Sequence, residues 1–551
     1  MSKLIADKIF PNVKGIHEYE VKYPERTQDN TVLTTRFGPS PTGFMHIGGL
    51  YTALVNYIVA KKSNGTFFLR IEDTDQKRLV KNGVLEIINT LNDFGIKFDE
   101  APIDENNDKG NYGPYIQSFR KEIYQAYAKY LVEKNYAYPC FCTEADIQEI
   151  KNYQKLQKSS LIGYAGEWAK CRKLNDEEII EKLNMGLKFA IRLKANGEIG
   201  KYKTFNDGIK GEIIMPENIL DIVILKSDGL PTYHFAHVID DHLMRTTDVI
   251  RADEWLSSLP IHVQMFEILG FKVPRYYHLS AIMKMEGNSR RKLSKRKDPE
   301  ARVGYYNEVG YPQKSVIDYM LTVCSADYED WRNENPDTDI INFPLDITKT
   351  GTSGALFDNE KLDFISKKCI GLMSHEEIKS AVLKWSSQFN KKFYNFLLNN
   401  EYYFEKSIPI WHEDRLDVRK WLDLVTFYPY MYDNDFHIDK DSIAEVIIIK
   451  KDDVILILND YVDTFDINDD NDTWFSKIKV IAQKYNYAVQ MKAYKKDPTL
   501  YNGSIVDVAA FIRYAITQKL ETPDIYQIIQ LLGRNTSLSR VKKLIEVLKN
   551  I

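Results

Sequence analysis

Apolar positions in the first part of the chain fall into two patterns that predict different elements. Continuous apolar or β-branched runs at residues 31–35, 66–71 and 219–225 predict buried strands. Apolar side chains three or four positions apart at residues 50–58 and 84–94 predict helices that follow the first two strands. We therefore assign the N-terminal half to the α/β class.

From about residue 370 onward, the spacing of apolar residues is almost entirely helical. Ser374 and Glu377 form the pattern of a capping box at the start of one helix. Residues 506–516 and 525–532 repeat the helical spacing nearer the C-terminus. The sequence therefore predicts an all-α region over residues 370–551.

Residues 36–49 form a turn rich in proline and glycine between the first predicted strand and its helix. Two prolines stop the strand, and Gly43, Gly48 and Gly49 let a ligand approach the backbone closely. The following helix points its N-terminal N–H groups at this turn, which favours a bound phosphate. His46 can donate a hydrogen bond to a phosphate oxygen. The alternative is a loop that only joins a strand to a helix.

A second stretch, residues 290–297, is almost wholly basic. A solvated charged loop and a localisation signal are the ordinary interpretations of such a run. The basic stretch comes much later in the chain than the turn at residues 36–49. This order of the two stretches is more informative than either stretch alone.

Three carboxylates, Glu72, Asp73 and Asp75, follow the predicted strand at residues 66–71. Ligands of parallel α/β sheets bind outside the carboxyl ends of the strands, where such a cluster can hold an ammonium group or Mg²⁺. The alternative is structural, with Asp75 capping the next helix and Asp73 pairing with Arg78. We favour a ligand role for Glu72 and a partly structural role for the two aspartates.

The overall composition limits the class of protein. The 551 residues are enough for several domains, and fractions of 44% hydrophobic and 28% charged residues are typical of a soluble globular chain. Five cysteines in so long a chain do not form a disulfide framework, which favours a reducing cytoplasm. We find no apolar run that could span a membrane and no signal peptide. A net charge of −4 restricts any nucleic-acid surface to a local basic patch.

The two motifs resemble those of one enzyme family. Residues 46–49, His-Ile-Gly-Gly, resemble the HIGH signature of class I aminoacyl-tRNA synthetases, and residues 292–296, Lys-Leu-Ser-Lys-Arg, resemble their KMSKS loop. The longer stretches 36–49 and 70–75 are similar to glutamyl-tRNA synthetases of bacterial type. The resemblance runs in order from about residue 31 to the C-terminus.

This resemblance implies a Rossmann-type catalytic domain with an inserted acceptor-stem-binding domain, followed by an all-α anticodon-binding region. A glutaminyl-type enzyme would carry β-barrels in place of the last helices. The implied division is an N-terminal extension at 1–30, a first catalytic half at 31–125, the insertion at 126–218, a second catalytic half at 219–270, a stem-contact region with the KMSKS-like loop at 271–369, and the helical anticodon-binding region at 370–551.

The resemblance also implies a reaction and its partners. The enzyme is expected to activate L-glutamate with ATP, accompanied by Mg²⁺, to glutamyl-adenylate and pyrophosphate. It is then expected to transfer glutamate to the 3′ end of tRNA-Glu in protein synthesis, and tRNA-Gln is a second substrate that the resemblance leaves open. A cytoplasmic monomer that contacts the acceptor stem and the anticodon of its tRNA is expected.

Residues that match the family's motifs form two sets. The resemblance assigns ATP binding to Gly38, Pro39, His46, Gly48, Gly49, Lys292, Leu293, Ser294 and Lys295, among which His46 and Lys295 are catalytic. It assigns glutamate binding to Arg36, Ser40, Glu72, Tyr233, His237 and Arg251. His237 stands where asparagine is expected, so its role in the glutamate pocket is open.

Arg251 ends a short predicted strand at residues 248–251, and a buried arginine needs an anionic partner. The γ-carboxylate of glutamate suits its bidentate fork, and Arg36 supplies a second cation for a substrate with two carboxylates. The alternative is an internal ion pair, for example with Asp253.

Cys140, Cys142 and Cys171 are weak zinc candidates. Some glutamyl-tRNA synthetases hold zinc here with a fourth ligand two residues after the last cysteine, where this chain has Lys173. Lysine is not a ligand of structural zinc sites, which are almost always four-coordinate. We therefore predict buried free thiols and no zinc.

Three other functions fit parts of the sequence. They are a free-standing nucleotidylyltransferase of the same superfold, a shorter relative that glutamylates a modified tRNA base, and a tRNA-binding protein without catalytic activity. The long helical region argues against the first two, and the presence of both ATP signatures argues against the third.

Overall fold

The computed structural model describes residues 3–27, 29, 31–104, 107–159, 161–413, 417–426, 428–432, 436–438 and 443–551. The chain forms two compact units, of which the first contains Met1–Tyr305 and Ile317–Asp358 and the second contains Tyr306–Val316 and Asn359–Ile551. Every predicted site residue belongs to the first unit. Among the described residues, no helix combines the length and the apolar composition that a bilayer crossing needs.

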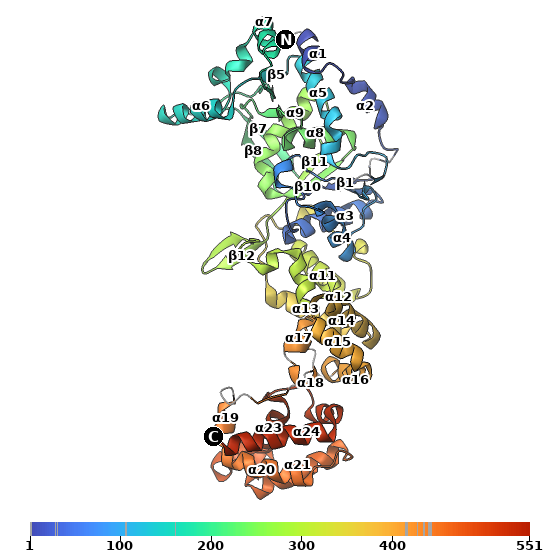
Figure 1. The fold of residues 1–551 in the computed structure, drawn as a ribbon, viewed down its shortest axis with the longest axis vertical. Helices are drawn as coiled ribbons and strands as arrows, with labels where there is room; N and C mark the ends of the chain where they lie inside the picture. The colour runs from blue at the N-terminus through green and yellow to red at the C-terminus, as the bar shows by residue number, and fades with distance from the viewer. Residues whose placement is uncertain are drawn as a thin grey trace. The chain divides into compact units, whose positions relative to one another are not determined.

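Two strand–helix–strand crossovers form the centre of the first unit (Figure 1). Their elements are β1 (Thr34–Phe37), α3 (Ile47–Lys62) and β2 (Thr66–Leu69) in one crossover, and β10 (Asp248–Ala252), α9 (Leu259–Leu269) and β11 (Arg275–Leu279) in the other. Both strand pairs are parallel. β1, β2 and β10 are almost fully buried, as expected for strands covered on both faces, whereas β11 begins with the exposed Arg275. The α/β class predicted for this half is confirmed.

The two crossovers meet along β1 and β10. The backbone N–H of Thr247 donates to the carbonyl of Thr34 over 3.0 Å, and Asn56 of α3 donates to the carbonyl of Ile250 over 3.1 Å. The carboxyl ends of β1, β2 and β10 consequently face the same edge, so the residues that follow each strand gather there.

Two antiparallel arrangements cross the boundaries of the predicted domains. β5 (Ala137–Cys140), β6 (Ala190–Leu193) and β9 (Val223–Leu225) form one sheet, whereas the hairpin of β7 (Tyr202–Asp207) and β8 (Gly211–Pro216) extends the sheet of β10 and β11. The predicted insertion therefore shares both sheets with the second catalytic half. The domain boundary expected after residue 125 falls inside α5, which runs without a break from Lys121 to Glu133.

The other elements up to residue 334 are α4 (Gly83–Asp93), β3 (Ala101–Pro102), β4 (Asp108–Lys109), α5 (Lys121–Glu133), α6 (Glu144–Leu156), α7 (Asp176–Asn184), α8 (Tyr233–Leu243), β12 (Met283–Glu286), β13 (Ser289–Lys292), α10 (Val303–Val309), α11 (Gln313–Cys324) and α12 (Tyr328–Glu334). The helix predicted at residues 84–94 corresponds to α4, and the strand predicted at residues 219–225 is limited to β9.

The region expected to be a plain N-terminal extension is part of the folded core. Its described residues form α1 (Lys3–Ile9) and α2 (Ile16–Lys22), which bury Ile5 and Tyr19 against the first unit. Residues 1, 2, 28 and 30 of the predicted extension lie outside the described residues. The polar composition of the segment concealed a short apolar spacing, which only becomes a helix face when a core is present to cover it.

Glu20 ties α2 to the first unit. It accepts hydrogen bonds from Tyr127 over 2.6 Å and from His242 over 2.9 Å, and Arg245 lies 3.1 Å away. Burial alone would raise the pKa of Glu20, but these partners lower that pKa to about 2. The depressed pKa means that the carboxylate stabilises the fold above about pH 4.3, the unfolded value, and loses this contribution as the pH falls toward 2.

We expect Glu20→Gln to lower the free energy of unfolding at pH 7 by about 1–3 kcal/mol. The difference in the free energy of unfolding between variant and unmodified chain should shrink at pH 3, where the carboxyl of the unfolded chain is protonated. Chemical denaturation at both pH values measures this difference. Glu18→Gln is the control, since Glu18 pairs with Lys14 on the surface. A loss as large at pH 3 as at pH 7 would contradict the electrostatic origin.

The second unit is helical, as predicted. Its elements are α13 (Asn359–Gly371), α14 (His375–Phe389), α15 (Lys391–Asn399), α16 (Glu401–His412), α17 (Leu422–Thr426), α18 (Pro429–Tyr432), α19 (Glu445–Ile449), α20 (Lys451–Thr464), α21 (Asn471–Lys484), β14 (Tyr487–Ala488), α22 (Met491–Lys496), β15 (Gly503–Ser504), α23 (Ile505–Thr517) and α24 (Ile525–Lys549). The capping box of Ser374 and Glu377 is present. Gly533, with φ of 75°, is not helical, so α24 consists of two helices that meet at a kink there.

Candidate active site

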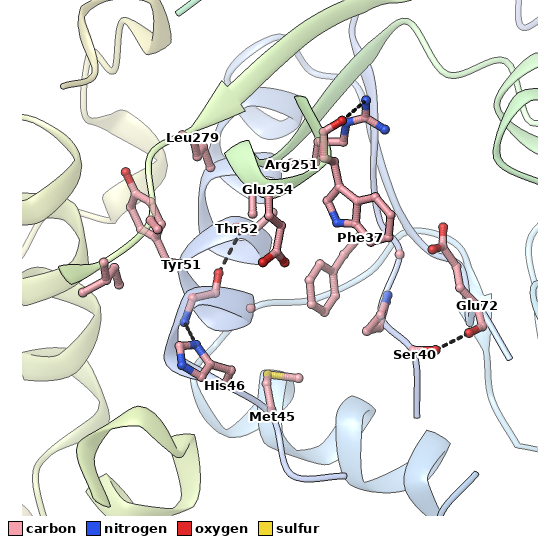
Figure 2. A pocket seen from close by; sticks show the side chains of 18 of the residues that line it. Phe37, Ser40, Met45, His46, Tyr51, Thr52, Glu72, Arg251, Glu254 and Leu279 are labelled. Carbon is pink, nitrogen blue, oxygen red and sulfur yellow. Dashed lines mark hydrogen bonds between the residues drawn. The ribbon is translucent and has the colours of Figure 1, made fainter. Parts of the chain in front are cut away.

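The turn at residues 36–49, the basic loop and the strand ends line one pocket of about 530 Å³ in the first unit. Figure 2 shows the part of this pocket around His46, Glu72 and Arg251. A volume of this size suits a small-molecule site. All the predicted ATP- and glutamate-binding residues line it except His237, namely Arg36, Gly38, Pro39, Ser40, His46, Gly48, Gly49, Glu72, Tyr233, Arg251, Lys292, Leu293, Ser294 and Lys295. Segments far apart in the sequence therefore converge at the carboxyl edge of the sheet.

His46 stands at the start of α3 and uses both ring nitrogens within the protein. Its Nδ1 accepts the backbone N–H of Gly48 over 3.0 Å, and its Nε2 lies 3.1 Å from the carbonyl oxygen of Leu293. The ring is therefore neutral with its proton on Nε2. Burial lowers the pKa of His46, in agreement with this state. Donation to a phosphate, as the sequence predicts, requires Nε2 to leave Leu293.

The basic loop packs onto the turn through its lysines. Lys295 Nζ donates to the carbonyl oxygen of Phe44, and Lys292 forms an ion pair with Glu254, which follows β10. Burial lowers the pKa of Lys295. Both ammonium groups lie at the wall of the pocket, so either can exchange its present contact for a phosphate oxygen.

Asp298 anchors the same loop from behind. Its carboxylate accepts hydrogen bonds from the two terminal nitrogens of Arg291, over 2.6 and 2.8 Å, and from the backbone N–H of Ser294 over 2.9 Å. The hydrogen bonds from Arg291 hold the pKa of Asp298 well below its usual range. The backbone is thus fixed on both sides of Lys295, which directs that side chain toward the turn.

Glu72 places a buried carboxylate in the wall of the pocket. Its Oε1 accepts a hydrogen bond from Arg70 over 2.9 Å, and Ser40 donates to its backbone carbonyl over 2.6 Å (Figure 2). A Cβ at Gly38 would come within 2.5 Å of Glu72 Oε1, so the glycine provides the space for this side chain. Burial raises the pKa of Glu72, which a ligand ammonium group would counteract.

The neighbouring aspartates are structural and do not line the pocket. Asp73 Oδ1 accepts the backbone N–H of Ser118 over 2.8 Å. Asp75 caps a short 3₁₀-helix and lies 2.6 Å from Arg78. The capping role proposed for Asp75 is therefore present, but Arg78 pairs with Asp75 and not with Asp73.

Asp241 links two buried arginines, Arg36 and Arg70. Its Oδ1 accepts a hydrogen bond from Arg70 over 2.6 Å and lies 3.2 Å from Arg36 Nε. Burial opposes ionisation, yet the guanidinium groups of Arg36 and Arg70 hold the pKa of Asp241 well below its usual range. Nothing in the sequence indicates this role of Asp241, because its two arginine partners come from distant segments of the chain.

Arg251 is not paired with Asp253, the alternative considered from the sequence. Asp253 lies 3.9 Å from Lys210. Arg251 instead donates from Nε to His278 Nε2 over 3.0 Å and from Nη2 to the carbonyl of Trp255 over 3.3 Å. Its guanidinium lines the pocket at the end of β10 (Figure 2).

The structure does not place His237 at the pocket. Tyr233 and His237 are one turn apart on α8, so Tyr233 lines the pocket while His237 lies fully buried behind it. The Nε2 of His237 lies 3.0 Å from Tyr276 Oη, and its Nδ1 lies 3.0 Å from Asp241 Oδ2. Burial lowers the pKa of His237 to about 3 and raises the pKa of Tyr233 to about 12, so both groups are neutral.

Comparison with known proteins decides the family. The family described as "tRNA synthetases class I (E and Q), catalytic domain" matches residues 32–363, and the one described as "Anticodon binding domain" matches residues 418–545. Glutamate–tRNA ligase of Clostridium perfringens (strain SM101) is 44% identical over 546 residues, with 98% of both chains covered. The chain belongs to the class I glutamate–tRNA ligases.

Other members of the ligase family agree with this assignment. The glutamate–tRNA ligase of Acetivibrio thermocellus is 43% identical over 551 residues, covering 98% of this chain and all of the relative. The crystal structure of a glutamate tRNA ligase from Elizabethkingia meningosepticum in complex with its amino acid has a TM-score of 0.72 at 26% identity, covering 94% of this chain and 99% of the other. The chain is therefore an aminoacyl-tRNA-forming ligase by family.

The zinc candidates of this ligase lie together outside the pocket. The sulfur atoms of Cys140, Cys142 and Cys171 are within 4.8 Å of one another. The Oη of Tyr164 adds an oxygen 3.5 Å from Cys140 Sγ and 3.2 Å from Cys142 Sγ. No spacing rule relates Tyr164 to these thiols, because the tyrosine and the cysteines stand in separate segments of the chain.

Proposed function

We propose that this class I ligase activates L-glutamate with ATP and transfers it to tRNA-Glu in the pocket described above. An oxygen of the α-carboxylate forms a bond to the α-phosphorus, the bond from that phosphorus to the bridging oxygen breaks, and pyrophosphate leaves. A terminal ribose hydroxyl of the tRNA then attacks the carbonyl carbon, and AMP leaves. The observation that supports this proposal is the convergence of a phosphate-binding turn, a basic loop, Glu72 and Arg251 on one pocket.

The turn and the basic loop are proposed to bind ATP. The N-terminus of α3 offers backbone N–H groups and a positive dipole end to the phosphates. His46 donates from Nε2 to a phosphate oxygen, and Lys295 neutralises charge on the β- and γ-phosphates as pyrophosphate forms. The substrate supplies its own nucleophile, so catalysis consists of positioning and charge stabilisation. We infer that Mg²⁺ enters with ATP.

Three other charged side chains, Glu72, Arg251 and Arg36, are proposed to bind glutamate. Glu72 receives the α-ammonium group, since Oε2 of its carboxylate has no hydrogen-bond partner among the described residues. Arg251 receives the γ-carboxylate, and Arg36 supports the α-carboxylate. The Tyr233 hydroxyl, which is protonated, can donate to either carboxylate.

The tRNA partner is proposed from the second unit and the inserted segment. The match of residues 418–545 to an anticodon-binding family supports contact with the anticodon. Residues 126–218 are proposed to contact the acceptor stem, and the enzyme is proposed to act as a cytoplasmic monomer. tRNA-Glu is the expected substrate, with tRNA-Gln as the second tRNA to be tested beside it.

Glutamate-dependent exchange between ATP and pyrophosphate tests the proposed function. We expect exchange only in the presence of tRNA-Glu, in keeping with the family resemblance. Exchange without any tRNA would indicate a free-standing amino-acid activator. Folded protein that shows no exchange in either condition would contradict the proposal, and charging of purified tRNA-Gln would decide the substrate range.

We propose that the thiol cluster holds a structural Zn²⁺ ion, in place of the free thiols predicted from the sequence. Tetrahedral zinc sites need four donors, and three sulfur atoms with one phenol oxygen provide them. We propose that Cys140, Cys142, Cys171 and Tyr164 hold the ion. It would link the end of β5 to the loop before α7 and supply no reacting group.

Metal analysis tests this site directly. We expect about one Zn²⁺ per chain in purified protein, because four-donor sites bind zinc tightly. Tyr164→Phe should accelerate loss of the ion to a chelator, and Cys142→Ser should abolish binding. Tyr153→Phe is a matched control on the exposed face of α6. Zinc-supplemented protein that retains no metal would refute the site.

A further inference from the structure

Arg251 differs from the other buried arginines of the first unit in what surrounds its charge. Each of the others has a carboxylate within 3.2 Å, in the pairs Arg36–Asp241, Arg70–Asp241 and Arg120–Asp240. No carboxylate of the described residues lies within 4.0 Å of the Arg251 guanidinium. The side chain is only 4% exposed, so solvent does not replace the missing partner.

Two neutral histidines hold Arg251 in place of carboxylates. Its Nε donates to His278 Nε2 over 3.0 Å, and a terminal nitrogen lies 3.2 Å from His262 Nδ1. Arginine has only donors, so each facing nitrogen must carry a lone pair. Asp207, 2.6 Å from His278 Nδ1, and His234, 3.0 Å from His262 Nε2, occupy the other ring nitrogens and fix both tautomers.

His237 supports this arrangement from behind. Its ring centroid lies 4.3 Å from that of His262, and its ring also contacts Tyr233 at 5.9 Å. Burial lowers the pKa of His262 well below its usual range, so no second positive charge develops beside Arg251. The histidine found where asparagine was expected therefore packs against an acceptor of Arg251 and not against a ligand.

We propose that His262 and His278 are positioning residues that set the selectivity of the pocket for an anionic side chain. They orient the guanidinium of Arg251 and leave it without a carboxylate partner until a ligand carboxylate arrives. This inference rests on the proposed function and specifies how glutamate is selected. A carboxamide of the same shape would leave the buried charge unpaired, whereas a carboxylate forms a charge-assisted pair.

An isosteric pair of variants at residue 262 tests the inference. His262→Asn retains an acceptor near the place of Nδ1, whereas His262→Asp puts a carboxylate there that neutralises Arg251. We expect His262→Asp to raise KM for glutamate by about 100-fold and to leave KM for ATP within about twofold. His262→Asn should raise KM for glutamate by less than about tenfold. Aminoacylation of tRNA-Glu measures both constants.

The outcomes separate this inference from the proposed function. Equal glutamate KM values for the two variants, or a parallel rise in KM for ATP, would overturn the role of the neutral acceptors. If thermal unfolding shows that His262→Asp does not fold, His278→Gln and His278→Leu carry the test. The glutamine amide oxygen can replace Nε2 as acceptor and leucine cannot, so only His278→Leu should raise KM for glutamate, and equal values would overturn the inference. An unmodified enzyme that activates no glutamate would refute the proposed function instead.

Discussion

Lys295→Ala is expected to lower kcat of aminoacylation by about 100- to 1,000-fold, with KM for glutamate changed by less than about threefold. The ammonium group lies in the basic loop at the wall of the pocket, held against the turn by its contact with Phe44. We propose that it meets phosphate charge that develops as pyrophosphate leaves, so its loss affects the transition state more than glutamate binding. Steady-state kinetics with glutamate and ATP varied separately measure the split.

Lys297→Ala is the matched control for this prediction. Lys297 belongs to the same loop but pairs with Glu286 at 3.4 Å and does not line the pocket. Its replacement should leave kcat within about twofold, as is usual for an exposed ion pair. An equal loss in both variants would point to the fold of the loop, and an unchanged kcat in Lys295→Ala would remove Lys295 from the mechanism.

Arg251→Gln is expected to lower kcat/KM for glutamate by at least about 100-fold. Glutamine retains hydrogen-bonding groups but no charge, so the γ-carboxylate of the substrate would be buried without a cation. KM for ATP should stay within about twofold, because Arg251 lies at the end of β10, whereas the turn that we propose to bind ATP follows β1. Initial rates at low glutamate concentration measure the change.

Arg78→Gln provides the comparison for Arg251. Arg78 is exposed and pairs with Asp75 outside the pocket. We expect kcat/KM for glutamate to remain within about twofold in this variant. A small effect of Arg251→Gln, similar to that of the control, would show that another group receives the side chain of glutamate.

Much of the candidate site could be predicted from features that involve residues close together in the sequence. The prolines and glycines of residues 36–49 define a strand-to-helix turn by their own backbone preferences, and the basic run at residues 290–297 is visible as composition. The capping box at Ser374 and the apolar spacing of the C-terminal helices are likewise short-range signals. Each depends on residues close in sequence, which is why each could be predicted.

Other features required contacts that no local pattern encodes. Tyr164 reaches the thiols of Cys140 and Cys142 from another loop. The two N-terminal helices fold because a core covers their apolar side chains. β7 pairs with β11 in parallel and β9 pairs with β6 antiparallel, both across the expected domain boundaries, because strand pairing follows proximity in space.

The sequence by itself determined the family, the order of the two ATP signatures and the identity of the charges placed at strand ends. Only the tertiary structure decided how those charges are balanced. Asp241 neutralises Arg36, whereas Arg251 meets neutral histidines and His237 turns away from the pocket. The reason is physical: a residue type carries its charge wherever it stands, but compensation of a buried charge depends on atoms within about 4 Å that the fold brings from distant segments.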